Sequence, residues 1–426
     1  MMMSGLKGYV KKKTRAAKQA SRQLTLVSTH DKNQALKRMG EKLWEKRDQI
    51  HEANQADLDA AIKNGLSKAK QDRLLINEKR LEEMIQGLNA LAVSQDPVGE
   101  VMDSYPRPNG LKVEKVRVPL GVIAIIYESR PNVTVDAAGL ALKAGNAVVL
   151  RGGKEAVLSN QALVQAMRES LSGTKFPVDS IQFIERTARD TIDYLIRDKE
   201  SVDLVIPRGG AGLIQRVVQN AHVPVIETGV GNCHIYVHAS ADLKMAGSIV
   251  INAKTQRPSV CNAMETLLVD QSIADEFLPQ LARKLAEKGV QVKGCEQTCR
   301  ILQHQSELHI GPADEEDYHT EFLDLILAVK VVQGWEEALA HIERFGTGHS
   351  EAIVAEDQAV VDGFLTRVDA SAVYHNASTR FTDGAEFGFG AEMGISTQKL
   401  HARGPMGLKE LTSYKYVIRG TGHVRA

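Results

Sequence analysis

The clearest chemical signal in this sequence is a single cysteine, Cys261, in residues 255–262 (TQRPSVCN). It follows Pro258, which ends a predicted helix, and its neighbours are too small or too polar to cover the sulfur. A thiolate can attack a carbonyl carbon. A helix N-terminus beside it would lower the pKa of the thiol and offer N–H groups to the oxyanion that forms. The stretch therefore predicts a nucleophile, and the alternative is a small buried apolar residue.

Further polar residues follow predicted strands. Glu227 could act as a general base, or it could be a solvated or helix-capping carboxylate. Gly209 and Gly210 precede a predicted helix, where glycines let a backbone approach a phosphate; a plain glycine turn fits as well. Arg151 and Lys154 could hold the 2′-phosphate of NADP, or they could be surface cations on a turn.

The elements that would position these residues alternate regularly between apolar strands and helices. Strands are predicted at residues 121–126, 147–150, 181–184, 202–206 and 223–226, and helices at 133–143, 156–171, 188–196 and 211–220. Such alternation predicts an α/β fold with a doubly wound parallel sheet. Ligands of these sheets bind beyond the carboxyl ends of the strands.

Two other regions flank this unit. Residues 14–95 carry apolar side chains at helical spacing, whereas residues 111–118 and the tail alternate like half-exposed strands. A second α/β region follows, with strands at 233–237, 265–269, 327–332 and 352–354 and helices at 241–254, 273–288, 335–345 and 359–366.

Composition narrows the class of protein. The 426 residues are enough for two or three domains, and 53 basic residues balance 53 acidic ones. A zero net charge gives no general attraction to nucleic acid or to an anionic membrane. The basic residues between Lys7 and Arg22 are predicted to lie on a solvent-exposed helix. The absence of a long apolar run or signal peptide predicts a cytoplasmic protein. Four cysteines make no disulfide framework, and Cys295 and Cys299 lack a second ligand pair, so no metal site is expected.

Seven ordered motifs together resemble the aldehyde dehydrogenase superfamily, from about residue 15 to the end of the chain. They are YESRPN (127–132), GGKEA (152–156), ETGVGNCH (227–234), QRPSVCN (256–262), GTGHSE (346–351), NASTRF (376–381) and GFGAEMG (388–394). One departure is Phe345, which stands where the signature segment usually has His or Tyr.

The resemblance is strongest to the branch that reduces L-glutamyl 5-phosphate to L-glutamate 5-semialdehyde with NADPH in proline biosynthesis. It implies that Cys261 displaces phosphate and forms a thioester, which hydride reduces to a thiohemiacetal that releases the semialdehyde. The alternatives are a generic NAD(P)-dependent aldehyde dehydrogenase and a catalytically inactive scaffold of the same fold.

The resemblance also implies roles for individual residues. Asn132 would donate to the oxyanion together with the backbone N–H of Cys261. Glu227 would orient groups on the cofactor side, because a reductase of an acyl phosphate needs no hydrolytic water. Glu321 would hold the nicotinamide ribose. The substrate's carboxylate and phosphate would be bound by Arg380, Asn376, Ser378, Arg130, Arg257 and His349.

The expected organisation follows from the same resemblance. A cofactor-binding domain would contain residues 1–100 and 119–232, and a catalytic domain residues 233–400. Residues 101–118 and 412–426 would form a small β flap that joins subunits, so a homo-oligomer is expected. A functional link to glutamate 5-kinase is implied as well.

Overall fold

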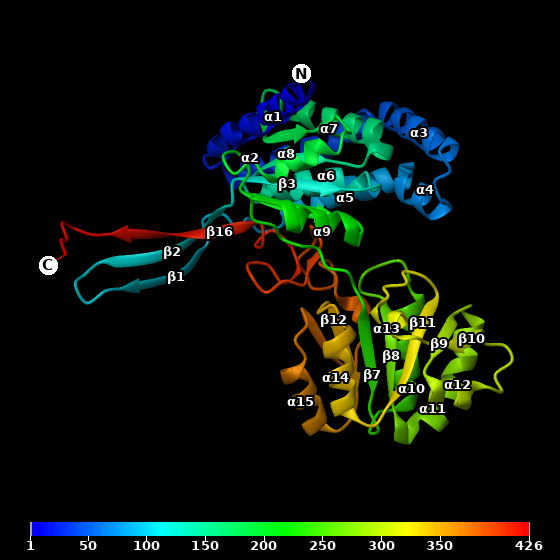
Figure 1. The fold of residues 1–426 in the computed structure, drawn as a ribbon. Helices are drawn as coiled ribbons and strands as arrows, with labels where there is room; N and C mark the ends of the chain where they lie inside the picture. Colours follow the sequence, from blue (N-terminus) through cyan, green and yellow to red (C-terminus); the bar gives the residue numbers. More distant parts are fainter. Residues whose placement is uncertain (1, 426) are drawn as a thin grey trace. The chain divides into compact units, whose positions relative to one another are not determined.

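The computed structural model describes residues 2–425 and divides into two compact units (Figure 1). The first contains the chain up to Thr228, together with Gly388–Gly394 and the chain from Met406 onward. The second contains Gly229–Phe387 and Ile395–Pro405. The sequence put this boundary between residues 232 and 233. It joined the tail to residues 101–118 in one flap, but it gave no sign that Gly388–Gly394 returns to the first unit.

The first unit begins with the helical region expected for residues 14–95. Its helices are α1 (Met2–Leu24), α2 (Thr29–Glu45), α3 (Arg47–Lys63), α4 (Lys68–Leu74) and α5 (Glu78–Val93). Side-chain oxygens cap two of them: Ser28 accepts from the Asp31 N–H at 3.2 Å, and Asn77 accepts from the Arg80 N–H at 2.9 Å. These caps satisfy backbone donors that a helix start leaves unpaired, and so fix where the helices begin.

The parallel sheet of the first unit has the order β5-β4-β3-β6. Its strands are β3 (Val122–Tyr127), β4 (Ala147–Arg151), β5 (Ile181–Phe183) and β6 (Leu204–Arg208), and its helices are α6 (Asn132–Lys143), α7 (Val157–Leu171), α8 (Asp190–Ile196) and α9 (Ala211–Asn220). Every residue of β3 is buried, as the apolar run predicted. A strand at residues 223–226 was wrong: only Val225 bridges to Val205, because Pro224 has no N–H to extend a ladder.

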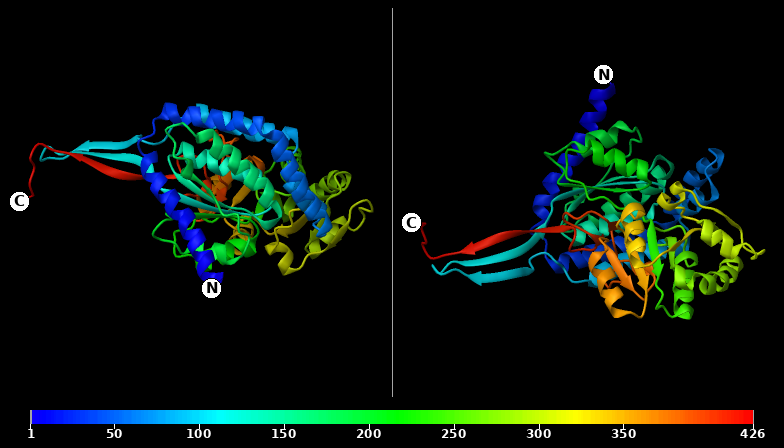
Figure 2. Two further views of the ribbon diagram at one scale, coloured as in Figure 1. Left: turned by 90° about the horizontal axis from the view of Figure 1, so that it is seen from above. Right: turned by 60° about the horizontal axis from the view of Figure 1, so that its bottom comes forward.

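A three-stranded flap projects from the first unit (Figures 1 and 2). Its strands are β1 (Val101–Pro106), β2 (Lys112–Pro119) and β16 (Thr412–Arg419), in the order β1-β2-β16. The predicted pairing of residues 111–118 with the tail is confirmed by an antiparallel register running from Thr412 opposite Pro119 to Arg419 opposite Lys112. No strand was predicted from the sequence at the position of β1.

The second unit is built on a seven-stranded parallel sheet of order β10-β9-β11-β8-β7-β12-β13. Its strands are β7 (Cys233–Val237), β8 (Met264–Asp270), β9 (Gln291–Gly294), β10 (Ile310–Pro312), β11 (Ile326–Val332), β12 (Ser350–Val354) and β13 (Ala372–His375). Its helices are α10 (Leu243–Thr255), α11 (Gln271–Glu287), α12 (Glu296–Leu302), α13 (Glu315–His319), α14 (Trp335–Phe345) and α15 (Gln358–Arg367). A short antiparallel pair, β14 (Ile395–Ser396) and β15 (Gly404–Pro405), completes it.

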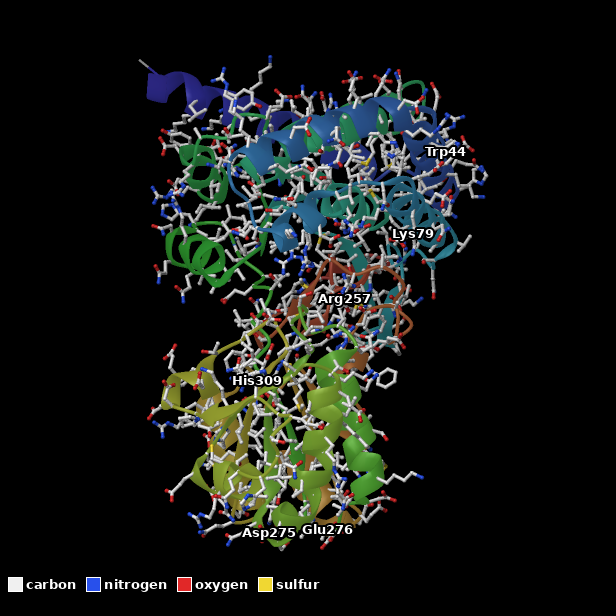
Figure 3. All side chains as sticks on the ribbon, turned by 90° about the vertical axis from the view of Figure 1, so that its right-hand side faces the viewer. Trp44, Lys79, Arg257, Asp275, Glu276 and His309 are labelled. Carbon is white, nitrogen blue, oxygen red and sulfur yellow. The ribbon has the colours of Figure 1, made fainter. Side chains whose placement is uncertain are left out.

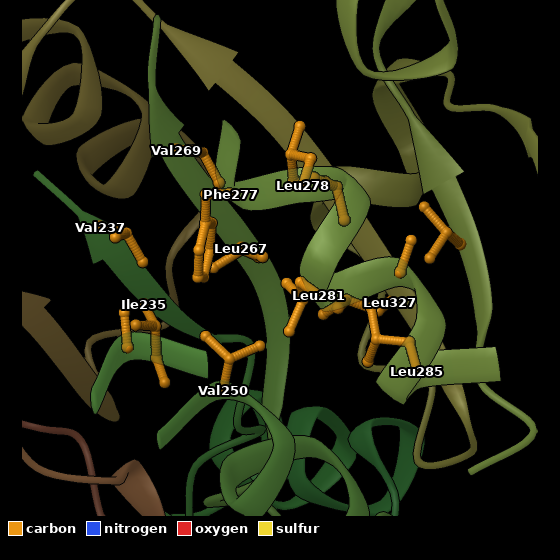
Figure 4. Close-up of a cluster of buried hydrophobic side chains, with 14 of the residues drawn as sticks. Ile235, Val237, Val250, Leu267, Val269, Phe277, Leu278, Leu281, Leu285 and Leu327 are labelled. Carbon is orange, nitrogen blue, oxygen red and sulfur yellow. The ribbon is translucent and has the colours of Figure 1, made fainter. Parts of the chain in front are cut away.

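Successive side chains of a strand point to opposite faces of the sheet. Both faces of this sheet carry apolar side chains, and helices cover each of them. Ile235 and Val237 of β7 pack with Leu281 of α11 and its neighbours in one apolar cluster, part of which is shown in Figure 4. Tyr236, between them in sequence, joins Phe364 of α15 in a second cluster. The central strands are thus fixed from both sides.

Among residues 2–425, no helix is both long and apolar enough to cross a membrane. The same residues contain no group of three or more His, Cys, Asp or Glu side chains arranged to hold a metal ion.

Candidate active site

Cys261 lies in a turn between the end of α10 at Thr255 and the start of β8 at Met264. Pro258 prevents α10 from continuing, and the Ala263 N–H donates to the Val260 carbonyl at 3.1 Å to close the turn. The residue is half-buried. The predicted strand at residues 265–269 does follow the cysteine, as β8, and the element before it ends as a helix C-terminus, so no helix of the adjoining chain starts at Cys261.

The segment that enters β7 packs against the backbone of this turn. A Cβ atom added to Gly231 would lie 1.5 Å from the Cys261 carbonyl oxygen, so only glycine fits there. The thiol of Cys233 donates to the same oxygen at 3.2 Å. Burial raises the pKa of the Cys233 thiol well above its usual value, so Cys233 stays protonated at neutral pH and is a poor nucleophile.

A late loop holds the other side of the turn through Asn262. The Thr379 hydroxyl donates to the Asn262 carbonyl at 2.8 Å, and the Asn262 side-chain amide donates to the Thr382 carbonyl at 2.9 Å. The short 3-10 helix η3 (Thr379–Phe381) begins here, and its cap is the Ser378 hydroxyl, which accepts from the Arg380 N–H at 3.3 Å. The motif around residue 380 therefore positions Asn262, the residue that follows Cys261.

Arg380 is the cation of this loop. Its Nε donates to Gln256 at 2.8 Å, and its Nη1 donates to the Asn262 side-chain oxygen. Desolvation lowers the pKa of Arg380, and Arg257 lowers it further, whereas Cys261 raises it, so the guanidinium and the Cys261 thiol interact electrostatically. Arg257, which is labelled in Figure 3, is an exposed residue.

His349 and Asn376 have partners within the fold. His349 is fully buried, with Nδ1 2.8 Å from the Ser350 hydroxyl, and burial lowers its pKa to about 4, so the ring is neutral at pH 7. Asn376, at φ +52°, accepts from the Ala355 N–H at 3.1 Å and donates to the Ala355 carbonyl at 3.2 Å. Their predicted contacts with substrate stay predictions, and the bonds observed here serve loop geometry.

Glu321 is also engaged by the chain. Its carboxylate accepts the N–H of Gly231 at 2.8 Å, and burial raises its pKa. The neighbouring Asn232 was not singled out from sequence, although it is fully buried and donates to the Tyr318 and Phe345 carbonyls at 2.6 and 2.8 Å. Phe345 thus contributes a backbone oxygen, which any side chain at that position would leave in place.

The first unit carries four of the five predicted cofactor residues, Arg151 and Lys154 at the carboxyl end of β4 and Gly209 and Gly210 after β6, and β3 lies between these two strands. Lys154 follows β4 and is exposed. Arg151 is buried, and its terminal nitrogens donate to the Gly152 and Thr187 carbonyls at 2.9 and 2.8 Å. The Gly210 N–H, at the start of α9, donates to the Glu128 carboxylate at 3.0 Å. An anion reaching this edge would meet Lys154 directly, whereas Arg151 would first have to exchange its carbonyl partners.

The remaining first-unit predictions differ in exposure. Asn132, the first residue of α6, is exposed, and its amide donates to Asp136 at 3.1 Å. Desolvation raises the pKa of Asp136 to about 6. Glu227 is partly exposed, and Arg130 is exposed.

Comparison with known proteins assigns this chain to one family. Residues 4–301 match the model of the aldehyde dehydrogenase family. The chain is 59% identical over 409 residues to the gamma-glutamyl phosphate reductase of Carboxydothermus hydrogenoformans, covering 96% of this chain and 97% of that protein. It is 58% identical over 416 residues to the enzyme of the same name from Moorella thermoacetica, covering 98% of each.

Solved structures agree with these relatives. The crystal structure of gamma-glutamyl phosphate reductase from Thermotoga maritima matches with a TM-score of 0.95 at 52% identity, covering 98% of this chain and 100% of that one. An acetylating aldehyde dehydrogenase from Geobacillus thermoglucosidasius shares the fold, with a TM-score of 0.70 at 19% identity over 100% of this chain and 99% of that one. The chain therefore belongs to the aldehyde dehydrogenase family and, within it, to the gamma-glutamyl phosphate reductases.

Proposed function

We propose that this chain catalyses the NADPH-dependent reduction of L-glutamyl 5-phosphate to L-glutamate 5-semialdehyde with release of phosphate. The observation that carries the proposal is the half-buried Cys261 in a turn that glycine, asparagine and arginine residues hold from two sides. The identity of over 50% to reductases of that name supports the choice of substrate.

Cys261 would do the covalent chemistry. Its thiolate attacks the acyl carbon, the bond to the phosphate oxygen breaks, and inorganic phosphate leaves while a thioester forms on the sulfur. A thioester is a better hydride acceptor than a carboxylate, so one difficult reduction becomes two easier steps. Hydride addition to the thioester carbonyl leaves a thiohemiacetal on the sulfur; as its oxygen loses its proton and re-forms the carbonyl, the C–S bond breaks, the electron pair returns to sulfur and the semialdehyde leaves.

Arg380 is the cation we assign to the substrate. A guanidinium can bind a carboxylate or phosphate through two parallel N–H donors, and it lies within electrostatic range of Cys261. Arg257 and Arg130 are exposed cations that could serve the same anions, and His349 is neutral at pH 7. Asn132 is the side chain we assign as the donor to the oxyanion.

The nicotinamide cofactor supplies the hydride when it is bound. Family members use this cofactor class, and we propose NADP for this chain because exposed Lys154 gives a cation where a 2′-phosphate would need one. Gly209 and Gly210 would lie along the backbone of the nucleotide. Glu321 would accept from the nicotinamide ribose, and Glu227 would orient the cofactor side. The contacts of Arg151 make it the weakest member of this set.

The flap is the surface we assign to assembly as a homo-oligomer. Tyr414, Tyr416 and Ile418 alternate along β16 and are 47, 54 and 60% exposed, so one face of a three-stranded sheet presents apolar side chains to solvent. The acyl phosphate substrate must come from a kinase that phosphorylates a glutamate side-chain carboxylate, which is the proposed link to glutamate 5-kinase.

The test is a phosphate-dependence assay in the reverse direction. Glutamate semialdehyde and NADP are incubated with and without inorganic phosphate, using wild type, Cys261→Ser and, as matched control, Cys299→Ser. We expect wild type and Cys299→Ser to require phosphate, and Cys261→Ser to lose activity by at least about 10³-fold. Oxidation without phosphate would instead indicate a generic aldehyde dehydrogenase.

A further inference from the structure

A fully buried ion pair closes the base of the turn that carries Cys261. Lys254, in the last turn of α10, and Glu265, the second residue of β8, are both 0% exposed, and Nζ lies 2.5 Å from Oε2. The two residues flank the turn on either side. Their contact therefore fixes how far apart the end of the helix and the start of the strand lie.

The other carboxylate oxygen of Glu265 reaches a second loop. It accepts the N–H of Leu323 at 3.1 Å, and Leu323 has φ +55°, a left-handed conformation that a leucine adopts only where its surroundings hold it. Two residues earlier in that loop, Glu321 accepts the N–H of Gly231. Gly231 packs against the carbonyl of Cys261, so this chain of contacts returns to the nucleophile.

Stability alone does not account for a pair at this depth. Removing two charges from water is unfavourable, and a buried ion pair can often be replaced by apolar residues of similar size without loss of stability. Burial raises the pKa of Glu265 and lowers that of Lys254, while each partner's charge opposes the other's shift. What an apolar pair could not do is accept the Leu323 N–H while bridging the two ends of the turn.

We propose that Lys254 and Glu265 are a positioning pair for the reaction at Cys261. The pair sets the geometry of the nucleophile's turn directly, through the bridge between α10 and β8. It also acts indirectly, because Glu265 fixes the Leu323 loop, whose Glu321 holds Gly231 against the Cys261 carbonyl. The inference rests on the proposed function, in which Cys261 is the nucleophile.

Two double variants separate positioning from stability. Lys254→Met with Glu265→Gln removes the ion pair but keeps an oxygen for the Leu323 N–H, whereas Lys254→Met with Glu265→Leu removes both. Each leaves one buried polar group without a partner, so the two should match in stability. Tyr236→Phe is the control: it removes a buried hydrogen bond of 3.0 Å to Asp270, which joins β7 to the carboxyl end of β8, whereas the Cys261 turn precedes the amino end of β8.

The readouts are kcat and KM for glutamate semialdehyde, the rate of Cys261 alkylation by iodoacetamide, and Tm. We expect kcat to fall about 10-fold in the Met/Gln variant and about 100-fold in the Met/Leu variant, because small misplacements of a reacting atom have effects of this size. KM should stay within twofold. Alkylation should stay within threefold, because a small reagent needs no precise orientation of the sulfur. Tyr236→Phe should keep wild-type kcat.

A purely structural role would produce a different pattern. If kcat of the Met/Leu variant stays at the wild-type value, or if its loss equals the loss of folded protein at the assay temperature, the positioning role is refuted. Cys261→Ser separates this failure from failure of the proposed function. An active Cys261→Ser enzyme would refute the nucleophile itself, whereas an inactive one beside fully active pair variants would refute only the pair.

Discussion

Replacing Gly231 by alanine should remove most of the activity while leaving a folded protein. The added Cβ would lie 1.5 Å from the Cys261 carbonyl oxygen, 2.3 Å from its carbonyl carbon and 2.7 Å from its Cα. All three are backbone atoms, so no side-chain rotation can relieve the clash. Ordinary contact begins at 3.4 Å, so the two segments must separate by about 2 Å.

The size of the effect follows from that displacement. A misplacement of about 1 Å at a reacting group can reduce turnover by about 10²-fold, so we expect kcat of Gly231→Ala to fall by at least that factor. Forcing extra volume into a packed site typically destabilises by about 1–3 kcal/mol, which a protein of this size can tolerate. Circular dichroism and thermal unfolding would establish that the variant is folded under the assay conditions.

Gly247→Ala provides the matched control. Gly247 lies inside α10, the helix that leads to Cys261, and an added Cβ would meet only the Lys284 ammonium at 3.7 Å. Alanine is favoured over glycine in a helix by about 1 kcal/mol, so this variant should be at least as stable as wild type and fully active. A folded Gly231→Ala enzyme with kcat within threefold of wild type would refute the packing argument.

Two further predictions concern the side chains around the turn. Asn262→Ala removes a hydrogen bond from the charged Arg380, so kcat/KM should fall about 30-fold, the equivalent of about 2 kcal/mol; a steady-state change below threefold would contradict this role. For His349 the folded-state pKa of about 4 lies below the unfolded value of about 6.5, so the unfolded state binds the proton between these values and stability falls as the pH drops through that window. The free energy of unfolding in urea should fall between pH 7.5 and pH 4.5, and the fall should be about 2–3 kcal/mol smaller in His349→Asn than in wild type. Equal falls in the two proteins would show that this histidine is not the group responsible.

The sequence predicted more of the second unit's architecture than of its site. The strand-like stretch at residues 265–269 and the helical repeat at residues 335–345 are local patterns, and a local pattern is enough to define a strand or a helix. The failures have local causes too. Pro224 interrupts an otherwise strand-like run, and the short strands β10 and β13 have too few residues for a period to be recognised.

The site depended on contacts that no local pattern carries. Lys254 and Glu265 each look like an ordinary charged residue in sequence, yet both are completely buried. Nothing in the sequence distinguishes Asn262 beyond its place after a cysteine, and only the structure shows its contacts with residues 379–382. Arg151 was predicted from the sequence to bind a phosphate, but its guanidinium donates to two backbone carbonyls instead. Burial and partner choice are set by chain segments that meet only after folding.

The sequence alone determined the class of this protein, since seven ordered motifs are readable without coordinates, and it singled out Cys261 as the candidate nucleophile. Only the tertiary structure decided how that cysteine is held: by a glycine from the approach to β7, an asparagine bound to a late loop, and an ion pair across the turn's base. The physical reason is the separation along the sequence of the residues that interact. Element type depends on neighbours along the chain, whereas the position of a reacting atom depends on packing and hydrogen bonds between residues far apart in sequence.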